Sequence, residues 1–265
     1  MNLDMSLLSW PRPAVRPASK MLLRSLLLYR RSWKQNLLPQ FFEPLLYLLS
    51  IGFGLGLYIG QRIAGVDYVL FITPGLIAAA AMNGAIFEVT YNIFIKLRFV
   101  HLYDAVITTP LEPEDVAVGE LTWAVLRSLI YGTVFLLVSF ALGYVRSPWA
   151  LAAPLGVALV GLAFSTLGMI YTGLVSRIES FGYFFTLFIT PLFLFSGIFF
   201  PFGNLPAVAR LFGWLTPLHH GVEMLRALLL MGDGATAAVH ALWLLVFSTL
   251  SFPLAVNLFR RHLVV

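Results

Sequence analysis

Long apolar runs separated by short polar connections dominate the pattern of this chain. A helix that crosses the hydrocarbon core of a bilayer needs about 20 mostly apolar residues, and six runs are near or above this length. The pattern therefore predicts an all-α integral membrane protein with six transmembrane helices. The predicted spans cover about residues 41–60, 68–94, 116–144, 149–175, 181–200 and 235–259.

An amphipathic helix is predicted over residues 20–36, ahead of the first span. A helix with one apolar face and a basic stripe lies in the membrane interface beside anionic headgroups. The alternative is a basic flank that only orients the chain. Residues 1–19 are rich in proline and basic side chains and are predicted to form a mobile tail. The apolar face consists of Met21, Leu22, Leu23, Leu26, Leu27 and Trp33, and the basic stripe of Lys20, Arg24, Arg31 and Lys34.

A second short amphipathic helix is predicted over residues 97–108, in the connection between the second and third spans. Its pattern ends at Thr109-Pro110. A helix held between two long spans can transmit force from the cytoplasm to the membrane helices; the alternative is an inert helix at the interface. The positions that recur at helical spacing are Leu97, Val100, Tyr103 or Asp104, and Ile107.

A helical hairpin is predicted over residues 201–232, between the fifth and sixth spans. Its first helix runs from Pro206 to Trp214, and its second begins at Thr216-Pro217 and stops near Gly232. At about 1.5 Å per residue neither helix crosses a core of about 30 Å. The pattern therefore predicts a hairpin that enters the membrane and returns to the same side. Such irregular backbone requires surrounding protein or a cavity.

Composition and charge agree with one membrane domain over residues 20–265. Of the 265 residues 60% are hydrophobic and 11% are charged, whereas soluble domains carry about 25% charged residues. Most Lys and Arg residues outside the spans fall on the side of the two termini. The positive-inside rule therefore predicts cytoplasmic termini and an outer hairpin, and the basic net charge does not indicate nucleic-acid binding.

Two charges lie well inside predicted spans: Glu88 in the second and Arg127 in the third. Each would cost about 2.5–3.5 kcal/mol if it faced lipid alone. Their similar depth predicts an inward-facing pair, which would be either a structural ion pair or a contact for a substrate headgroup.

The outer hairpin carries a histidine pair, and His219 and Glu223 share a helix face in a spacing that can hold a metal. The set of His219, His220 and Glu223 offers too few ligands, and the chain has no cysteine. We therefore predict no metal site and expect Glu223 to pair with Arg226 three residues later.

Several short segments, in this order, resemble the type-2 ABC transporter permeases. The resemblance covers about residues 20–260 and is closest to the branch of nodulation-factor (lipo-oligosaccharide) export permeases, whose neighbours export polysaccharides, drugs and lipids. The segments are Phe87-Glu88 with Tyr91, Tyr103 to Leu111, Gly119-Glu120, Ser196-Gly197, Phe200-Pro201, Leu205-Pro206, and Thr216-Pro217-Leu218-His219 with Arg226.

The resemblance implies a non-enzymatic permease subunit of the bacterial inner membrane, which forms a homodimer and works with two copies of a separate ABC ATPase. ATP and Mg²⁺ would be held by that partner, and the printed sequence has no G-x-x-x-x-G-K-[ST] phosphate-binding loop. The helix over 97–108 would be the coupling helix and the hairpin an outer gate. The implied coupling residues are Leu97, Arg98, His101, Tyr103, Asp104, Ile107 and Pro110, and the implied gate residues are Phe200, Pro201, Pro206, Pro217, His219, Glu223 and Arg226.

Two other classes of function remain as alternatives. An ion-coupled secondary transporter would be expected to show an inverted repeat and several buried ionisable groups, whereas we see no repeat and one candidate pair. An integral-membrane lipid-modifying enzyme would use His219, His220 and Glu223, and would turn over without a partner.

Overall fold

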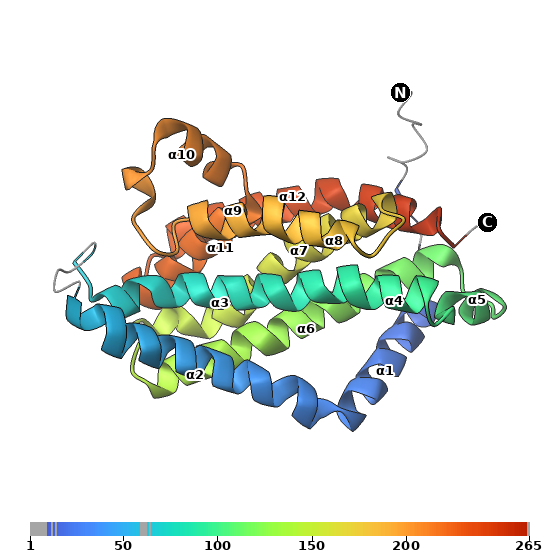
Figure 1. Cartoon of the computed structure of the whole chain (residues 1–265), viewed down its shortest axis with the longest axis horizontal. Helices are drawn as coiled ribbons and strands as arrows, with labels where there is room; N and C mark the ends of the chain where they lie inside the picture. The colour runs from blue at the N-terminus through green and yellow to red at the C-terminus, as the bar shows by residue number, and fades with distance from the viewer. Residues whose placement is uncertain (1–9, 12, 14, 59–62, 64, 264–265) are drawn as a thin grey trace.

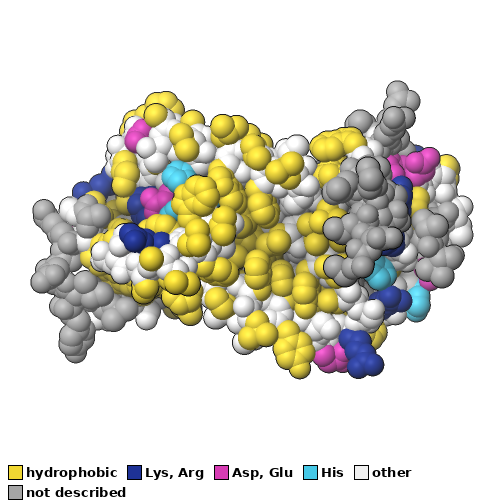
Figure 2. Space-filling model, turned by 90° about the horizontal axis from the view of Figure 1, so that it is seen from above, with side chains coloured by type: hydrophobic (Ala, Val, Ile, Leu, Met, Phe, Trp, Pro, Cys, Tyr) yellow, Lys and Arg dark blue, Asp and Glu magenta, His cyan; other side chains and the backbone are white. Residues whose placement is uncertain are grey.

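The computed structural model describes residues 10, 11, 13, 15–58, 63 and 65–263. Within these ranges the chain is helical, apart from turns and one isolated β-bridge between Ile63 and Val66. Figure 1 shows that most helices run along the long axis of one bundle. In Figure 2 the middle of the visible face is mainly apolar, and charged side chains gather toward its two ends. This distribution suits a protein that crosses a bilayer.

Four helical stretches of the described chain are long and apolar enough to cross a membrane, and they correspond to four of the six predicted spans. The first combines α3 (Tyr68–Phe87), the π-turn η2 (Glu88–Asn92) and α4 (Ile93–Arg98); the others are α6 (Pro113–Ala141), the 3-10 turn η3 (Pro148–Ala152) with α7 (Ala153–Leu174), and α12 (Gly234–Arg260).

The two remaining predicted spans coincide with helices that are not among the four that are long and apolar enough to cross a membrane. They are α2 (Trp33–Tyr58) and a 16-residue stretch that combines α8 (Ser180–Phe184), the π-turn η4 (Phe185–Ile189) and α9 (Thr190–Phe195). The six-span count therefore stays a prediction. The fifth predicted span ends five residues early, because the chain turns at Ser196 and Gly197, whose φ of +87° favours glycine.

Helix α3 lies at the centre of the bundle, where it packs against α6 and α7. It is buried along nearly its whole length, and small residues allow its neighbours to approach closely. At Gly84, for example, an added Cβ would lie 3.0 Å from the Tyr131 ring. This position of α3 places its polar residues between other helices and away from lipid.

The N-terminal helix differs from the prediction at both ends. Helix α1 covers Val15–Arg31 rather than 20–36, and residues 33–36 already belong to α2. The helix breaks at Ser32, whose hydroxyl donates to the Leu28 carbonyl at 3.3 Å while its backbone N–H donates to the Tyr29 carbonyl; such side-chain bonds compete with the helical ladder. Residues 15–19 of the predicted tail are therefore helical, and most of the other tail residues lie outside the described ranges.

The helix predicted over 97–108 is shorter than expected. Helix α5 covers only Leu102–Ile107, while Leu97 and Arg98 end α4. The chain reverses between the two helices at His101, which adopts a left-handed φ of 51° and interrupts the helical pattern. The sequence periodicity continued through this reversal, so it could not locate the boundary.

Both helices of the predicted hairpin are present, but they differ in their surroundings. Following the 3-10 turn η5 (Phe202–Asn204), α10 (Ala207–Trp214) has Pro206 at its N-cap. Helix α11 (Pro217–Arg226) continues through the π-turn η6 (Ala227–Met231) to Gly232, whose φ is +68°. Figure 1 shows α10 standing out from the bundle and α11 within it. That this hairpin enters the membrane stays a prediction.

The predicted coupling helix and the predicted outer gate lie at opposite ends of the molecule. Figure 1 shows α5 at one end of the bundle, together with the C-terminal end of α12, and α10 at the other end. We call these the inner end and the outer end, after the orientation predicted from the sequence.

Candidate functional site

A network of buried charged groups lies near the inner end. Its centre is Glu88, which is 2% exposed and stands where α3 widens into the π-turn η2. Arg127 Nη1 on α6 donates to Glu88 Oε2 at 3.0 Å, and the Asn92 amide donates to the same oxygen at 2.6 Å. The predicted pair of Glu88 and Arg127 is thus in contact. A π-turn places Glu88 within the bundle, as is common at functional sites.

Lys96 joins a second buried acid to this network. Its ammonium lies 3.0 Å from Glu88 Oε1 and 2.7 Å from Glu120 Oε2, while Glu120 is only 1% exposed. Two carboxylates therefore meet two cations, which satisfies the general requirement that buried charges be paired. Neither Lys96 nor Glu120 was predicted from the sequence as a member of the site. The sequence did offer one signal, because Lys96 follows Glu88 by eight residues, which is about two turns of a helix.

Tyr103 connects α5 to the buried charges. Its side chain is fully buried, and its hydroxyl donates to Glu120 Oε1 at 2.9 Å. Its ring packs edge-on against Phe259 of α12, with 5.6 Å between ring centroids. Burial and the neighbouring Glu120 carboxylate raise the pKa of the Tyr103 hydroxyl well above its usual range, so the hydroxyl keeps its proton. Contacts therefore run from α5 through α6 to the α3–α4 helix.

The implied coupling residues divide into a buried and an exposed group. Leu97 is buried with Tyr103, whereas the exposed His101 and Asp104 contact each other through ring nitrogen and carboxylate at 3.1 Å. Arg98 and Pro110 are exposed as well. The side chain of Ile107 lies outside the described parts of the chain. The exposed surface at α5 and the turn before it therefore combines polar side chains with apolar ones such as Phe99, and the buried face connects to the charge network.

At the outer end, Arg226 of α11 holds the turn that follows α9. Arg226 is 4% exposed, and its guanidinium pairs with Glu223 as predicted. Its Nη2 donates to the Gly197 carbonyl at 2.9 Å, and its guanidinium carbon lies 4.2 Å from the centre of the Phe71 ring. Arg226 thus ties α11 to the 196–200 turn and to α3.

Two histidines of α11 make further contacts between elements. His219 Nδ1 lies 3.1 Å from the Ser196 carbonyl, and its ring stacks on Phe202 with 3.8 Å between centroids. His220 Nε2 donates to the Trp214 carbonyl at 2.8 Å, and its Nδ1 lies 2.8 Å from His240 Nδ1. Both nitrogens of His220 are thus engaged within the fold, which favours a structural role over metal binding.

The remaining residues implied for the outer gate lie around this cluster. Pro217 is buried at the first position of α11, and Phe200, Pro201 and Pro206 are exposed or partly exposed. The structure therefore brings His219, Glu223 and Arg226 together and leaves the three residues before α10 at the surface.

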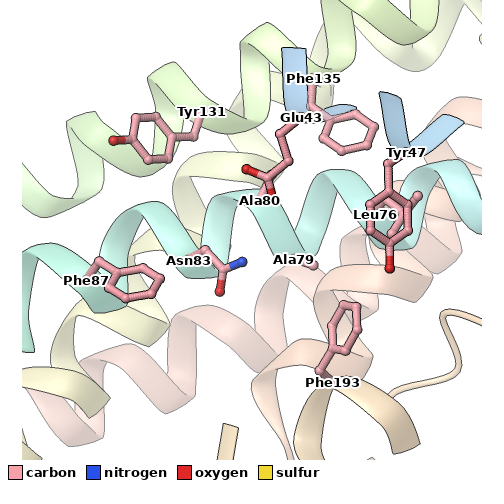
Figure 3. A pocket seen from close by; sticks show the side chains of 10 residues that line it. All are labelled: Glu43, Tyr47, Leu76, Ala79, Ala80, Asn83, Phe87, Tyr131, Phe135 and Phe193. Carbon is pink, nitrogen blue, oxygen red and sulfur yellow. The ribbon is translucent and has the colours of Figure 1, made fainter. Parts of the chain in front are cut away.

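A cavity of about 160 Å³ lies between α2, α3, α6 and α9. Figure 3 shows Glu43 and Tyr47 extending from α2 across α3, with Asn83 of α3 directed into the same space. The other walls are mostly apolar, and Tyr131 supplies a further hydroxyl. Glu43 and Tyr47 also line a neighbouring, mainly apolar groove of about 720 Å³ along α2.

Glu43 was not identified in the sequence analysis, although it is an acid inside the first predicted span. Its carboxylate is exposed, and no ion pair to it occurs in the described portion of the chain. Ionisable residues inside membrane segments usually mark a functional site. Together with the two tyrosines and Asn83, Glu43 can accept hydrogen bonds from a polar group whose apolar part lies in the groove.

The family model described as ABC-2 type transporter matches residues 19–230. Nodulation protein J of Sinorhizobium fredii is 35% identical over 236 residues, which cover 88% of this chain and 90% of that protein. Nodulation protein J of Bradyrhizobium diazoefficiens is 33% identical and covers 91% of each chain. The inner membrane transport permease YadH of Escherichia coli is 25% identical over 75% of this chain and 77% of its own length.

Proposed function

Because the chain belongs to the ABC-2 type transporter family, we propose that it is the membrane subunit of an ATP-driven exporter, which moves an amphipathic molecule outward from the cytoplasmic side. Membership of the family gives the chain a transport role, with no catalysis of its own. It also implies a partner, which is an ABC ATPase subunit. In the complete transporter two copies of this chain form a homodimer and pair with two copies of the ATPase, which hold ATP and Mg²⁺. The complex lies in a bacterial inner membrane, and the termini of the permease lie in the cytoplasm.

The observation that carries this proposal is the contact path from α5 into the bundle. An ATPase that moves on binding ATP would press on the exposed side of α5, near His101 and Asp104. Tyr103 is buried on the other side of α5, and its hydroxyl is hydrogen-bonded to Glu120 of α6, so a shift of α5 would pull on α6. Lys96 and Glu88 extend the path to the α3–α4 helix. This path provides the mechanical connection that an ATP-driven permease requires.

The substrate site in this proposal is the cavity at Glu43 with the adjoining groove. Two copies would meet along α2 and the α8–α9 stretch, which places the groove close to the seam between them. Apolar walls suit an acyl chain or another greasy part, and Glu43, Tyr47 and Asn83 suit a headgroup that carries hydroxyl or amine donors. Lipo-oligosaccharides have this chemistry, as do some glycolipids and drugs. The headgroup would leave at the outer end when α10 and α11 move apart.

Replacing Tyr103 by phenylalanine tests the coupling path. The ring packing against Phe259 is kept, but Glu120 Oε1 loses its donor. A hydrogen bond to a charged group contributes about 1.5–3 kcal/mol, so we expect ATP-driven transport to fall about tenfold or more while the ATPase still binds. The measurement is uptake of a fluorescent lipo-oligosaccharide into inverted vesicles that contain the permease and its ATPase, beside co-purification of the two proteins.

The matched control is Tyr144→Phe, which removes a hydroxyl from a partly exposed tyrosine between α6 and η3, away from the coupling path and from the proposed contact between the two copies. Transport by Tyr103→Phe at the rate of this control would show that the path does not carry the coupling. Uptake that needs neither ATP nor an ATPase would overturn the proposed function itself.

Replacing Glu43 by glutamine tests the substrate site. The change keeps the shape of the side chain but removes the charge that a donor-rich headgroup would meet. We expect the half-maximal concentration at which the lipo-oligosaccharide stimulates ATP hydrolysis to rise about tenfold, as for the loss of one charge-assisted hydrogen bond. Basal hydrolysis should be unchanged. Glu179→Gln, on the exposed connection before α8, is the control. An unchanged half-maximal concentration in Glu43→Gln would exclude Glu43 from substrate binding.

A further inference from the structure

We propose that a pocket beneath α1 binds a phosphate-bearing anion. The pocket has a volume of about 180 Å³ and lies between α1, α6 and the inner part of the α3–α4 helix. Arg24 and Tyr29 line it from α1, Arg127 from α6, and Glu88 and Lys96 from the remaining side. A cavity of about 150 Å³ can hold a benzene molecule, so this one has room for a phosphate group.

Three polar atoms of the pocket residues are buried without a hydrogen-bond partner among the described residues. They are Arg24 Nη1, Tyr29 Oη and Arg127 Nε. Nearly all buried polar atoms in proteins are hydrogen-bonded, so each exception requires an explanation. All three carry a hydrogen that they can donate. Three unmet donors around one pocket indicate a ligand that presents several acceptors.

The charges of the pocket indicate that this ligand is an anion. The carboxylate of Glu88 is already held by Lys96, Arg127 and Asn92. Lys96 is shared with Glu120, so two acids balance two cations and Arg24 remains as an excess positive charge. A guanidinium offers parallel N–H donors that match two phosphate oxygens. A phosphate could therefore satisfy Arg24 and Tyr29 without competing with the network.

The position of the pocket suggests a lipid headgroup as one source of the phosphate. Helix α1 presents exposed leucines, among them Leu23 and Leu27, as expected for a helix that lies in the membrane interface. Phospholipid phosphates lie at that level. The other possible source is free phosphate from the cytoplasm, because both sources present the same oxygens. In either case the ligand would join α1 to the residues around Glu88.

The test measures binding by the full-length chain, purified in a neutral detergent and stripped of lipid. Phosphatidylglycerol, phosphatidylcholine and inorganic phosphate are titrated separately, and bound ligand is followed by native mass spectrometry and by the shift in unfolding temperature. We expect phosphatidylglycerol to bind and Arg24→Gln to weaken its binding about tenfold. The control Arg31→Gln removes an equal charge from an exposed position of the same helix and should have little effect.

Each outcome bears on the proposal. Binding of phosphatidylglycerol alone supports a lipid headgroup as the ligand, and equal binding of inorganic phosphate supports the free ion. Equal losses in Arg24→Gln and Arg31→Gln would overturn the pocket in favour of general surface charge, and so would a lack of preference over phosphatidylcholine together with no phosphate binding. If Arg24→Gln does not fold, Tyr29→Phe replaces it, and unchanged affinity in that variant overturns the proposal.

Discussion

Replacing Glu88 by glutamine should destabilise the purified chain by about 3–5 kcal/mol, because it leaves two cations at the inner end without their shared acid. Glutamine has nearly the shape of glutamate, so the loss reports the charge and not a cavity. Lys96 would keep Glu120, but Arg127 would lose its only carboxylate contact among the described residues. For a chain of this size the loss corresponds to about 10 °C in thermal unfolding, which can be measured in detergent. ATP-driven transport should be lost as well.

The control for Glu88→Gln is Glu179→Gln, an acid on an exposed connection that should unfold like the unchanged protein. Similar unfolding temperatures for the two variants would show that the buried network does not stabilise the inner end. A double charge swap of Glu88 and Arg127 would be less informative. Lys96 also contacts Glu88, so an arginine at position 88 would face this second cation, and the swap is not expected to restore stability.

Replacing Arg226 by glutamine should destabilise the outer end by about 3 kcal/mol. The variant loses the ion pair with Glu223 and leaves the buried Gly197 carbonyl without its donor. We therefore expect faster amide hydrogen exchange in residues 196–202, while α5 at the opposite end exchanges as before. Hydrogen exchange with mass spectrometry of the purified chain measures both regions in one experiment.

Two further variants make the Arg226 experiment specific. Arg210→Gln removes an exposed arginine from α10 and should leave exchange in the 196–202 turn unchanged. Arg226→Lys keeps the charge but cannot reach both Glu223 and the Gly197 carbonyl with a planar fork, so partial recovery at most is expected. Unaltered exchange in Arg226→Gln would mean that other contacts, such as His219 with Ser196, hold the turn.

Many of the helical elements could be predicted from the sequence because their signals are local. The hydropathy of each run determines whether a helix is long and apolar enough to cross a membrane, and four such helices agree with the prediction. Thr216-Pro217 and Gly232 marked the two ends of the α11–η6 stretch, because proline fits the first turn of a helix and glycine accepts a positive φ. At His101 the same reasoning failed. The left-handed turn there is adopted by a residue that carries no such local signal.

The sequence by itself determined that this protein is helical, apolar and punctuated by proline and glycine at its turns, and it indicated that Glu88 and Arg127 had to face inward. Only the tertiary structure decided which side chains meet them. Tyr103, Glu120 and Lys96 come from three segments, and whether they converge depends on how each helix is rotated about its own axis. That rotation is set by close packing between helices, such as the contact of Gly84 with Tyr131, and no local pattern in one segment encodes it. The cavity at Glu43 arises in the same way, from the space that four packed helices leave between them.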